Sequence, residues 1–211
     1  MTALFPTGNR LLDRLPESDR QRFQPFLERI PLAFRQTLYA VRSEFDWVYF
    51  PISGMVSAMT IMEDGSAIEV ATVGNEGMTG LTAFTGGNTS PYEVMVQVPG
   101  EGLRMNVDNF RREVQREGEF RQIIGVYTTA FYVQISYSVA CNGLHQLEKR
   151  ACRWLLMTAD RIGSNTLPLT HEFLGIMLGV RRASVTEVLQ PLQQNGLIRF
   201  RFIKALSAVR D

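Results

Sequence analysis

The chain has 211 residues, of which 45% are hydrophobic and 20% are charged, so it is not an intrinsically disordered protein. The length suits one large domain or two modest ones. Two cysteines, Cys141 and Cys152, and two histidines, His145 and His171, are too few for a four-ligand zinc site, a cysteine-held iron–sulfur cluster or a disulfide framework. No apolar run approaches the roughly 18–20 residues of a membrane span, and residues 1–22 hold no stretch like a signal peptide. We therefore expect a cytoplasmic protein without a membrane partner.

The formal net charge of +1 hides an uneven distribution along the chain. Residues 1–146 hold 12 Arg, no Lys and 16 acidic residues, a net charge of −4, whereas residues 147–211 hold 10 basic and 5 acidic residues, a net charge of +5. A basic C-terminal third on an acidic body is typical of a nucleic-acid-binding module attached to another domain. Charge alone also fits a chance fluctuation, so the motifs must decide.

In the first half of the chain, the spacing of the apolar residues changes from a helical pattern to one typical of strands. Residues 9–30 have a helical spacing of apolar residues that Pro16 and Pro25 interrupt, which predicts two short helices. Residues 38–107 then carry short apolar segments separated by Gly and Pro. We expect strands at residues 47–50, 55–62, 68–73 and 92–98, with a hairpin turn at residues 63–66. Short strands at this spacing predict a β-sandwich, jelly roll or small barrel.

A long stretch without proline follows residue 108 and predicts a helix of about 30 residues, near 45 Å in length. One stripe of apolar and small residues runs along it at three-four spacing: Phe120, Ile124, Tyr127, Phe131, Gln134, Ser138 and Cys141. A helix of this length would extend beyond a small β domain, which favours a dimer seam over plain core packing. The seam is expected at Ile124, Tyr127, Phe131, Gln134 and Ser138. A second amphipathic helix is expected over residues 147–162.

Residues 170–189 have the pattern of a helix-turn-helix. Thr170 suits the N-cap of a first helix, whose buried face would hold Phe173, Leu174, Met177 and Leu178. Gly179 can adopt the left-handed conformation that ends this helix, and Gly175 supplies a small residue where the second helix crosses the first. A second apolar face follows within a few residues. Pro191 is expected to bend or end the second helix.

The polar face of the second helix has the side chains of a DNA major-groove reader: Arg181, Arg182, Ser184, Thr186 and Glu187. Arginine can bind guanine with two hydrogen bonds, Ser and Thr reach bases or phosphates, and Glu accepts from cytosine. Thr170, Arg199 and Arg201 complete the expected DNA-binding residues, the two arginines facing the phosphates. The alternative is an ordinary helical hairpin with a solvated face.

With these segments in view, the chain resembles the Crp/Fnr family of bacterial transcription regulators. The similarity is carried by residues 49–57, 72–80 and, most specifically, 178–185. It implies a cyclic-nucleotide-binding-like β-roll, a long dimerisation helix, a winged helix-turn-helix, and RNA polymerase as a partner. The family's recognition-helix arginine falls on Arg182, but Ala183 stands where a glutamate usually follows. Residues 199–211 contain no Gly or Asn for the wing turn, so we expect an incomplete wing.

The resemblance also implies an effector pocket, expected at Gly74, Gly77, Met78, Thr79, Gly80, Thr89 and Ser90. Cyclic-nucleotide binders in the family use a Gly-Glu pair for the ribose and an Arg about ten residues later for the phosphate, whereas Met78 follows Gly77 here. No Arg or Lys occurs between Arg42 and Arg104, an interval with eight acidic residues. A buried anion there would lack a cationic partner. We therefore expect a degenerate pocket that does not bind cyclic AMP, and its effector is unknown.

Other kinds of site find little support in the sequence. Metal-dependent jelly-roll enzymes need clustered histidines on strands, and none precedes His145. Cys141 and His145 are four residues apart on one helix, but no strained turn accompanies them, so a packed pair is favoured over a nucleophile. Haem ligation by a histidine or cysteine stays formally open. We expect no enzyme, metal or cofactor.

Together these features predict an α+β chain: a jelly-roll (double-stranded β-helix) sensor domain over residues 1–110, a dimerisation helix over 111–146 and a winged helix-turn-helix over 147–211. The predicted function is a homodimeric regulator that binds a palindromic operator in double-stranded DNA. The alternative is a dimeric β-roll scaffold with weakened DNA binding that acts through protein interaction.

Overall fold

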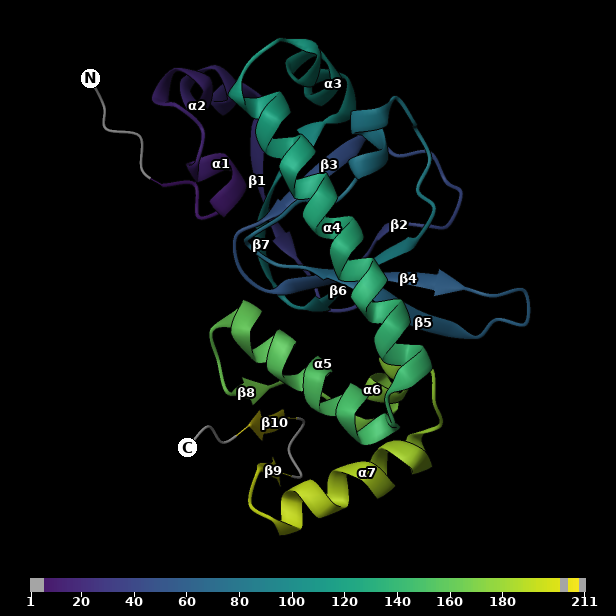
Figure 1. Cartoon of the computed structure of the whole chain (residues 1–211). Coiled ribbons are helices and arrows are strands. Elements are labelled where there is room, and N and C mark those ends of the chain that lie inside the picture. Colours follow the sequence, from purple (N-terminus) through teal and green to yellow (C-terminus); the bar gives the residue numbers. More distant parts are fainter. Residues whose placement is uncertain (1–5, 202–204, 209–211) are drawn as a thin grey trace. The chain divides into compact units, whose positions relative to one another are not determined.

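The computed structural model describes residues 6–201 and 205–208, with side chains for residues 6–200 (Figure 1). The chain forms two compact units. The first unit comprises Met1–Ala58 and Ala71–Gln134, and the second comprises Met59–Val70 and Ile135–Asp211. The boundary between them crosses the long helix and one β-hairpin, so the units do not coincide with the expected segments 1–110, 111–146 and 147–211.

Seven strands form two sheets, with the orders β1-β7-β3 and β2-β6-β4-β5. The strands are β1 (Leu27–Leu32), β2 (Thr37–Tyr39), β3 (Trp47–Pro51), β4 (Met55–Ile61), β5 (Ala67–Val73), β6 (Glu93–Val98) and β7 (Gly100–Asn106). Val48, Phe50, Met55, Val56 and Val96 are fully buried and supply much of the apolar core. The predicted strands are confirmed as β3, β4, β5 and β6. The fold class, a jelly-roll-like β domain followed by a long helix and a helix-turn-helix, is confirmed as well.

Strands β1, β2 and β7 have no counterpart among the predicted elements. The expectation that residues 27–30 continue a helix is wrong, because β1 pairs with β7 over six residues, from Leu27 opposite Met105 to Leu32 opposite Gly100. Strand β7 also pairs with β3 on its other side. Ladder hydrogen bonds with a segment some 70 residues away outweigh the local spacing of apolar side chains.

The N-terminal helices are short, as expected: α1 (Arg10–Asp13), α2 (Glu17–Phe23) and the 3₁₀ turn η1 (Gln24–Phe26). Asn9 attaches this segment to the sheets. Its carboxamide oxygen accepts hydrogen bonds from the first backbone N–H groups of α1. Its nitrogen donates to the carbonyl oxygens of Pro51, at 2.8 Å, and Gly77, at 2.9 Å. A fully buried amide is thus satisfied on both sides.

The expected single helix after residue 108 is two helices, α3 (Val107–Gln115) and α4 (Glu119–Leu144). Among the described residues, α4 is long and apolar enough to cross a membrane by length and composition alone, which corrects the expectation that no such segment exists. The chain carries no Asp, Glu, Lys or Arg between Arg121 and Glu148.

The second unit contains α5 (Leu147–Ile162), β8 (Thr166–Leu167), α6 (His171–Leu178), α7 (Arg182–Gln194), β9 (Ile198–Arg201) and β10 (Ala205–Ala208). The three strands form a small sheet in the order β8-β10-β9. Strands β9 and β10 pair from Ile198 opposite Ala208 to Arg201 opposite Ala205. The expectation of an incomplete wing is therefore wrong for the backbone, because the hairpin strands are paired; its connection, residues 202–204, lies outside the described residues.

Candidate nucleic-acid interface

Helix α6 begins where the sequence predicts. The hydroxyl of Thr170 accepts a hydrogen bond of 3.1 Å from the backbone N–H of Phe173, which satisfies one of the free donors at the helix start. Phe173, Leu174, Met177 and Leu178 are all at most 4% exposed. This face anchors the helix in the interior of the second unit, while its N-terminus is held by the cap.

The turn between α6 and α7 depends on two glycines. Gly179 has a φ of 64°, and its N–H donates to the carbonyl oxygens of Gly175 and Ile176. The N–H of Val180 also bonds to the carbonyl of Gly175, at 2.9 Å. A Cβ on Gly175 would lie 2.8 Å from the carbonyl oxygen of Val180, so a larger residue would push the turn away. Both glycines are therefore needed for the close crossing of the two helices.

An arginine outside the motif secures the end of α6. The guanidinium of Arg150, on α5, donates to the carbonyl of Leu178 and, at 3.0 Å, to the side chain of Asn142 on α4. The last carbonyls of a helix lack intrahelical partners and carry partial negative charge, so a cation is stabilising there. The sequence gives no signal for this contact, since Arg150 lies 28 residues from its partner.

Helix α7 separates its side chains cleanly into two faces. Val185, Leu189 and Leu192 are at most 5% exposed and hold the helix in place. Arg181, Arg182, Thr186 and Glu187 are exposed, and Ser184 is half-buried. The structure therefore brings the five predicted reading residues together on the solvent side of the first turns of α7. Of the two effects expected of Pro191, bending or ending the helix, the second does not occur, because α7 continues to Gln194.

His171 is a member of this site that was not among the predicted DNA-binding residues. Its Nδ1 lies 2.8 Å from the hydroxyl oxygen of Thr186, and that hydroxyl donates to the carbonyl of Arg182, at 3.1 Å. Because the Thr186 hydroxyl donates its hydrogen to that carbonyl, its oxygen can only accept from His171. In the neutral imidazole, Nδ1 therefore carries the hydrogen and donates it to the Thr186 oxygen. Burial and, to a smaller extent, the positive charge of Arg182 lower the pKa of His171. The ring of Phe200 contacts the imidazole edge to face, with 4.4 Å between ring centres.

The two predicted phosphate-contacting arginines lie on β9. Arg199 is exposed and pairs in register with Ser207 of β10. The backbone of Arg201 belongs to the same strand, but its side chain lies outside the described residues.

Four of the seven predicted effector residues line a cavity of the first unit, which is formed by strands β4, β5 and β6 of one sheet, the adjoining loops and α4. Met78, Thr79, Gly80 and Ser90 line it, whereas Gly74, Gly77 and Thr89 do not. Gly77 instead faces α4, since a Cβ there would lie 2.2 Å from the hydroxyl oxygen of Tyr127. That hydroxyl donates to the carbonyl of Met78, at 3.0 Å, and fixes the loop to the helix.

The predicted dimer stripe of α4 faces the interior of the protein. Ile124 is fully buried and Ser138 is 7% exposed. Gln134 accepts from the backbone N–H of Thr72, at 2.7 Å, and donates to its carbonyl, at 3.1 Å. Tyr127 and the half-buried Phe131 likewise face the first unit, through Met78 and the cavity wall. These contacts within the same chain disfavour the predicted seam on this face.

Two family models match separate parts of the chain. The cyclic nucleotide-binding domain matches residues 32–117, and the Crp-like helix-turn-helix domain matches residues 149–207. Together the two models cover most of the chain, with the cyclic nucleotide-binding domain first and the Crp-like helix-turn-helix domain second. The chain belongs to the Crp/Fnr family.

Solved structures of Crp/Fnr regulators agree with this assignment at the level of the fold. The global regulator CLP of Xanthomonas campestris is 16% identical, with a TM-score of 0.75 over 93% of this chain and 100% of that chain. FixK2 of Bradyrhizobium japonicum is 14% identical, with a TM-score of 0.74 over 87% and 93%. TTHB099, a CRP-family regulator of Thermus thermophilus, is 21% identical, with a TM-score of 0.70 over 86% and 92%. None of the curated protein sequences matches this chain.

As a Crp/Fnr member, the chain differs from the family pattern at both sites. Ala183, exposed on the first turn of α7, stands where a glutamate usually follows the recognition arginine. In the β-roll, the cavity wall contains no charged side chain. Among the described residues, no group of three or more His, Cys, Asp or Glu side chains could hold a metal ion.

Proposed function

We propose that the protein is a sequence-specific regulator of transcription that binds a palindromic operator in double-stranded DNA as a homodimer, with α7 in the major groove. The exposed polar face of Arg181, Arg182, Thr186 and Glu187, on a helix fixed by a capped turn, carries this proposal. It has the hydrogen-bonding groups that distinguish base pairs in the major groove. We propose RNA polymerase as a further partner and the cytoplasm as the location.

Selection of bound duplexes from a random DNA pool tests the proposal. We expect enrichment of an inverted repeat whose half-sites are about one helical turn apart. A single unrepeated site would contradict the dimeric mode. No enrichment, together with retained dimerisation, would favour the second candidate, a β-roll scaffold that acts through protein contacts.

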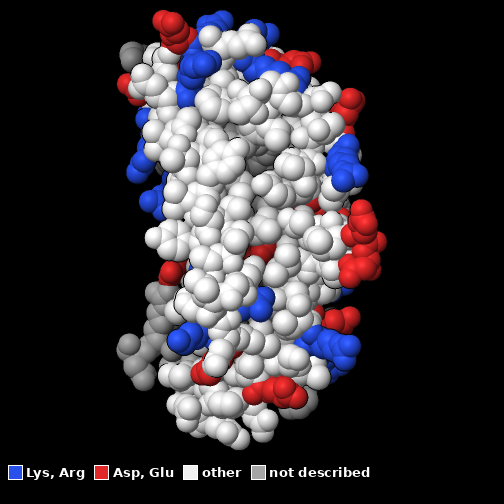
Figure 2. Space-filling model, turned by 45° about the vertical axis from the view of Figure 1, so that its right-hand side comes forward, with Lys and Arg blue, Asp and Glu red and all other residues white. Residues whose placement is uncertain are grey.

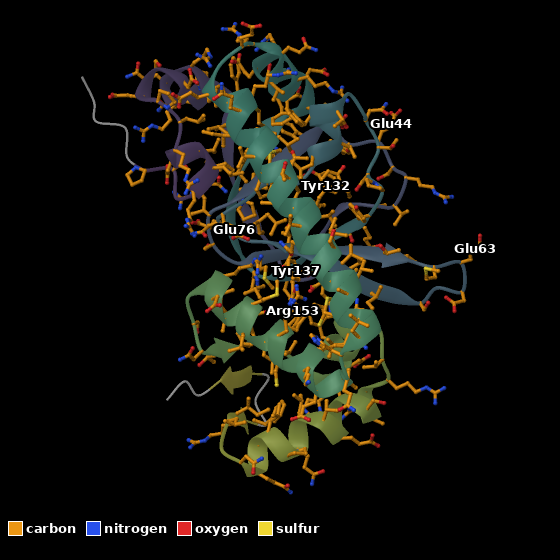
Figure 3. All side chains as sticks on the ribbon, viewed as in Figure 1. Glu44, Glu63, Glu76, Tyr132, Tyr137 and Arg153 are labelled. Carbon is orange, nitrogen blue, oxygen red and sulfur yellow. The ribbon has the colours of Figure 1, made fainter. Side chains whose placement is uncertain are left out.

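The homodimer is supported by the face of α4 opposite to the predicted stripe. Val126, Thr129, Val133, Ser136, Ala140 and Gly143 repeat at three-four spacing and are all exposed. Tyr132 and Tyr137, which are 61% and 67% exposed, flank this exposed stripe (Figure 3). The middle of the face in Figure 2 is largely without charged groups, and α4 itself has no Asp, Glu, Lys or Arg after Arg121. A solvent-facing helix normally carries charges, so a second copy of the stripe is the occupant we propose.

A membrane is the competing occupant, because α4 has the length and composition of a span. Lipid would have to surround the helix, whereas Ile124 is buried and Gln134 is hydrogen-bonded to Thr72 on its other face. We therefore propose the second copy. Light scattering in detergent-free buffer should show a dimer, and co-sedimentation of a monomeric protein with lipid vesicles would contradict it.

The β-roll cavity is proposed not to bind cyclic AMP. Its wall supplies no cation for a phosphate, and no Arg or Lys occurs in the sequence between Arg42 and Arg104. An unpaired anion transferred from water into such a site loses more free energy of hydration than it gains from contacts with the wall.

We also propose that the protein is not an enzyme.

A further inference from the structure

The β-roll cavity is partly open to the surface and has a mainly apolar wall. Its volume is about 50 Å³. The wall is formed by strands β4, β5 and β6, by the 3₁₀ turn η2 (Leu81–Thr85) and the loop that leads into it, by the loop before β6, and by α4. The lining residues are Val56, Ala58, Val73, Met78, Thr79, Gly80, Leu81, Thr82, Ser90, Pro91, Tyr92, Val94 and Phe131.

The wall contains neither a cation nor a carboxylate. An anionic ligand needs Arg, Lys or several hydrogen-bond donors, and a cationic ligand needs a carboxylate or an aromatic cage. Apolar side chains from Val56, Val73, Met78, Val94 and Phe131 dominate instead. The wall therefore suits an uncharged ligand.

The hydroxyl groups of Thr79, Thr82 and Ser90 in the wall already donate their hydrogens to other atoms of the protein. Ser90 donates to the carbonyl of Tyr92, at 2.7 Å, and Thr82 donates to the carbonyl of Thr89, at 3.0 Å. Tyr39 donates to the carbonyl of Trp47, so the hydroxyl of Thr79 donates to Tyr39, at 2.9 Å. Three hydroxyls that can only accept would repel an anion rather than bind it.

Tyr92 is a further polar side chain among the lining residues. Burial, with a smaller effect from Tyr132, raises the pKa of its phenol, so the hydroxyl keeps its proton at neutral pH. The phenol therefore adds no charge to the wall. The hydroxyls of Thr79, Thr82 and Ser90 can still accept a hydrogen bond, so the wall matches an apolar body with a single donor such as a hydroxyl.

The size of the cavity sets a further limit. A dry apolar cavity of about 150 Å³ accepts benzene, and this one has about a third of that volume. Pro91 is exposed, so the cavity reaches the surface there. Isobutanol is about as large as benzene, so the cavity can enclose only the apolar end of such a molecule, while the rest lies in the opening at Pro91. A base, a ribose and a phosphate together are far too large to be enclosed.

We propose that this cavity binds a small, uncharged, mainly apolar molecule with one hydrogen-bonding group. The proposal extends the proposed function, since such a molecule is the effector of the regulator, but binding itself does not depend on DNA. Phe131 belongs to both the cavity wall and α4. The ligand would therefore contact the helix that carries the exposed stripe.

The test uses three probes and the methyl NMR signals of the full chain. Isobutanol has a branched apolar body and one hydroxyl, isobutyrate is of similar size but anionic, and cyclic AMP is the family ligand. We expect isobutanol to shift the methyl signals of Val56, Met78 and Val94 saturably, while those of Leu174 and Leu189 in the second unit stay unchanged. Its dissociation constant should be at least about tenfold lower than that of isobutyrate.

A pair of identical substitutions provides the matched control. Ala58→Val adds two methyl groups to the cavity wall on a strand that favours β-branched residues, and should weaken isobutanol binding by at least about tenfold. Ala33→Val makes the same change at an exposed position outside the wall and should leave binding unchanged.

Equal or tighter binding of isobutyrate or cyclic AMP would overturn the proposal, because the site would then hold an anion. Absence of a saturable shift with isobutanol would overturn it too. If Ala58→Val does not fold, the comparison of the three probes on the unaltered chain still shows whether the cavity prefers an uncharged ligand to an anion. Selection of operator DNA is a separate measurement, so failure to bind DNA and failure to bind the probe are distinguishable.

Discussion

Arg182 is the residue on which sequence readout by α7 chiefly depends. It is exposed on the first turn, where side chains of a recognition helix approach base edges. Arg182→Ala should weaken operator binding by about 1–3 kcal/mol and relax the preference at one base pair in each half-site. Affinity for scrambled duplex should fall much less.

Binding isotherms on the selected operator and on scrambled DNA measure both effects. Arg153→Ala, which removes a half-buried arginine from α5, should change neither. An equal loss on both duplexes would identify Arg182 as a phosphate contact instead.

His171 gives the second unit a pH-dependent stability. Burial, and then Arg182, lowers the pKa of this imidazole below its usual 6.5, so the folded chain binds the proton less well than the unfolded chain. The contribution to the free energy of unfolding is full above about pH 6.5 and falls as the pH drops below that value. Urea denaturation from about pH 7 to 5 should show this decline.

His171→Asn keeps a donor near the hydroxyl of Thr186 but cannot titrate, so the decline should become shallower. His145→Asn, at an exposed position after α4, provides the control. An unchanged pH dependence in the His171 variant would exclude this histidine as the source.

The helix-turn-helix, as an element, depends on the close approach at Gly175. A Cβ there would lie 2.8 Å from the carbonyl oxygen of Val180, which is backbone and cannot rotate away. Gly175→Ala should therefore lower the free energy of unfolding by about 1–3 kcal/mol. Gly125→Ala, also in a helix but outside the exposed stripe, would place its Cβ at an ordinary distance of 3.8 Å from the ring of Phe84 and should instead raise it by about 0.5–1 kcal/mol through helix propensity. Urea denaturation of both variants makes the comparison, and a neutral Gly175→Ala would refute a tight crossing.

Helix α4 is the element proposed to join two protomers. Val133, 49% exposed, lies in the middle of the exposed stripe, so Val133→Glu places a charge between two copies and should give monomers with reduced operator affinity. Met62→Glu changes a 58% exposed apolar residue outside α4 and should leave the dimer intact. Light scattering distinguishes the two, and a dimeric Val133→Glu protein would disprove this seam.

At the scale of the whole molecule, the basic C-terminal third should make DNA binding strongly dependent on salt. Arg199 is exposed on β9, where phosphates are expected whatever the base sequence. Arg199→Ala should weaken operator and scrambled DNA alike and reduce the slope of log affinity against log salt by about 2, one contact in each protomer. Arg14→Ala, exposed in the first unit, should not change the slope. A loss confined to the operator would show that Arg199 reads bases.

The sequence by itself determined the parts of this protein whose signals are local. A capping threonine, a left-handed glycine and two apolar faces a few residues apart specify the helix-turn-helix, and short apolar runs between turn residues specify four of the strands. Each signal lies within one or two turns of the chain it shapes. The absence of cations from residues 43–103 likewise follows from the sequence alone.

Only the tertiary structure decided which face of α4 is buried, because the helix has no charged residue after Arg121 to mark its solvent side. Periodicity shows which residues share a face of a helix, but two faces of similar polarity compete for the interior. The hydrogen bonds of Tyr127 and Gln134 to partners 49 and 62 residues away settled that competition. The sequence did not predict strands β1 and β7 because their stability also comes from distant partners. A strand is stabilised by its partner across the ladder and not by its own neighbours in the chain.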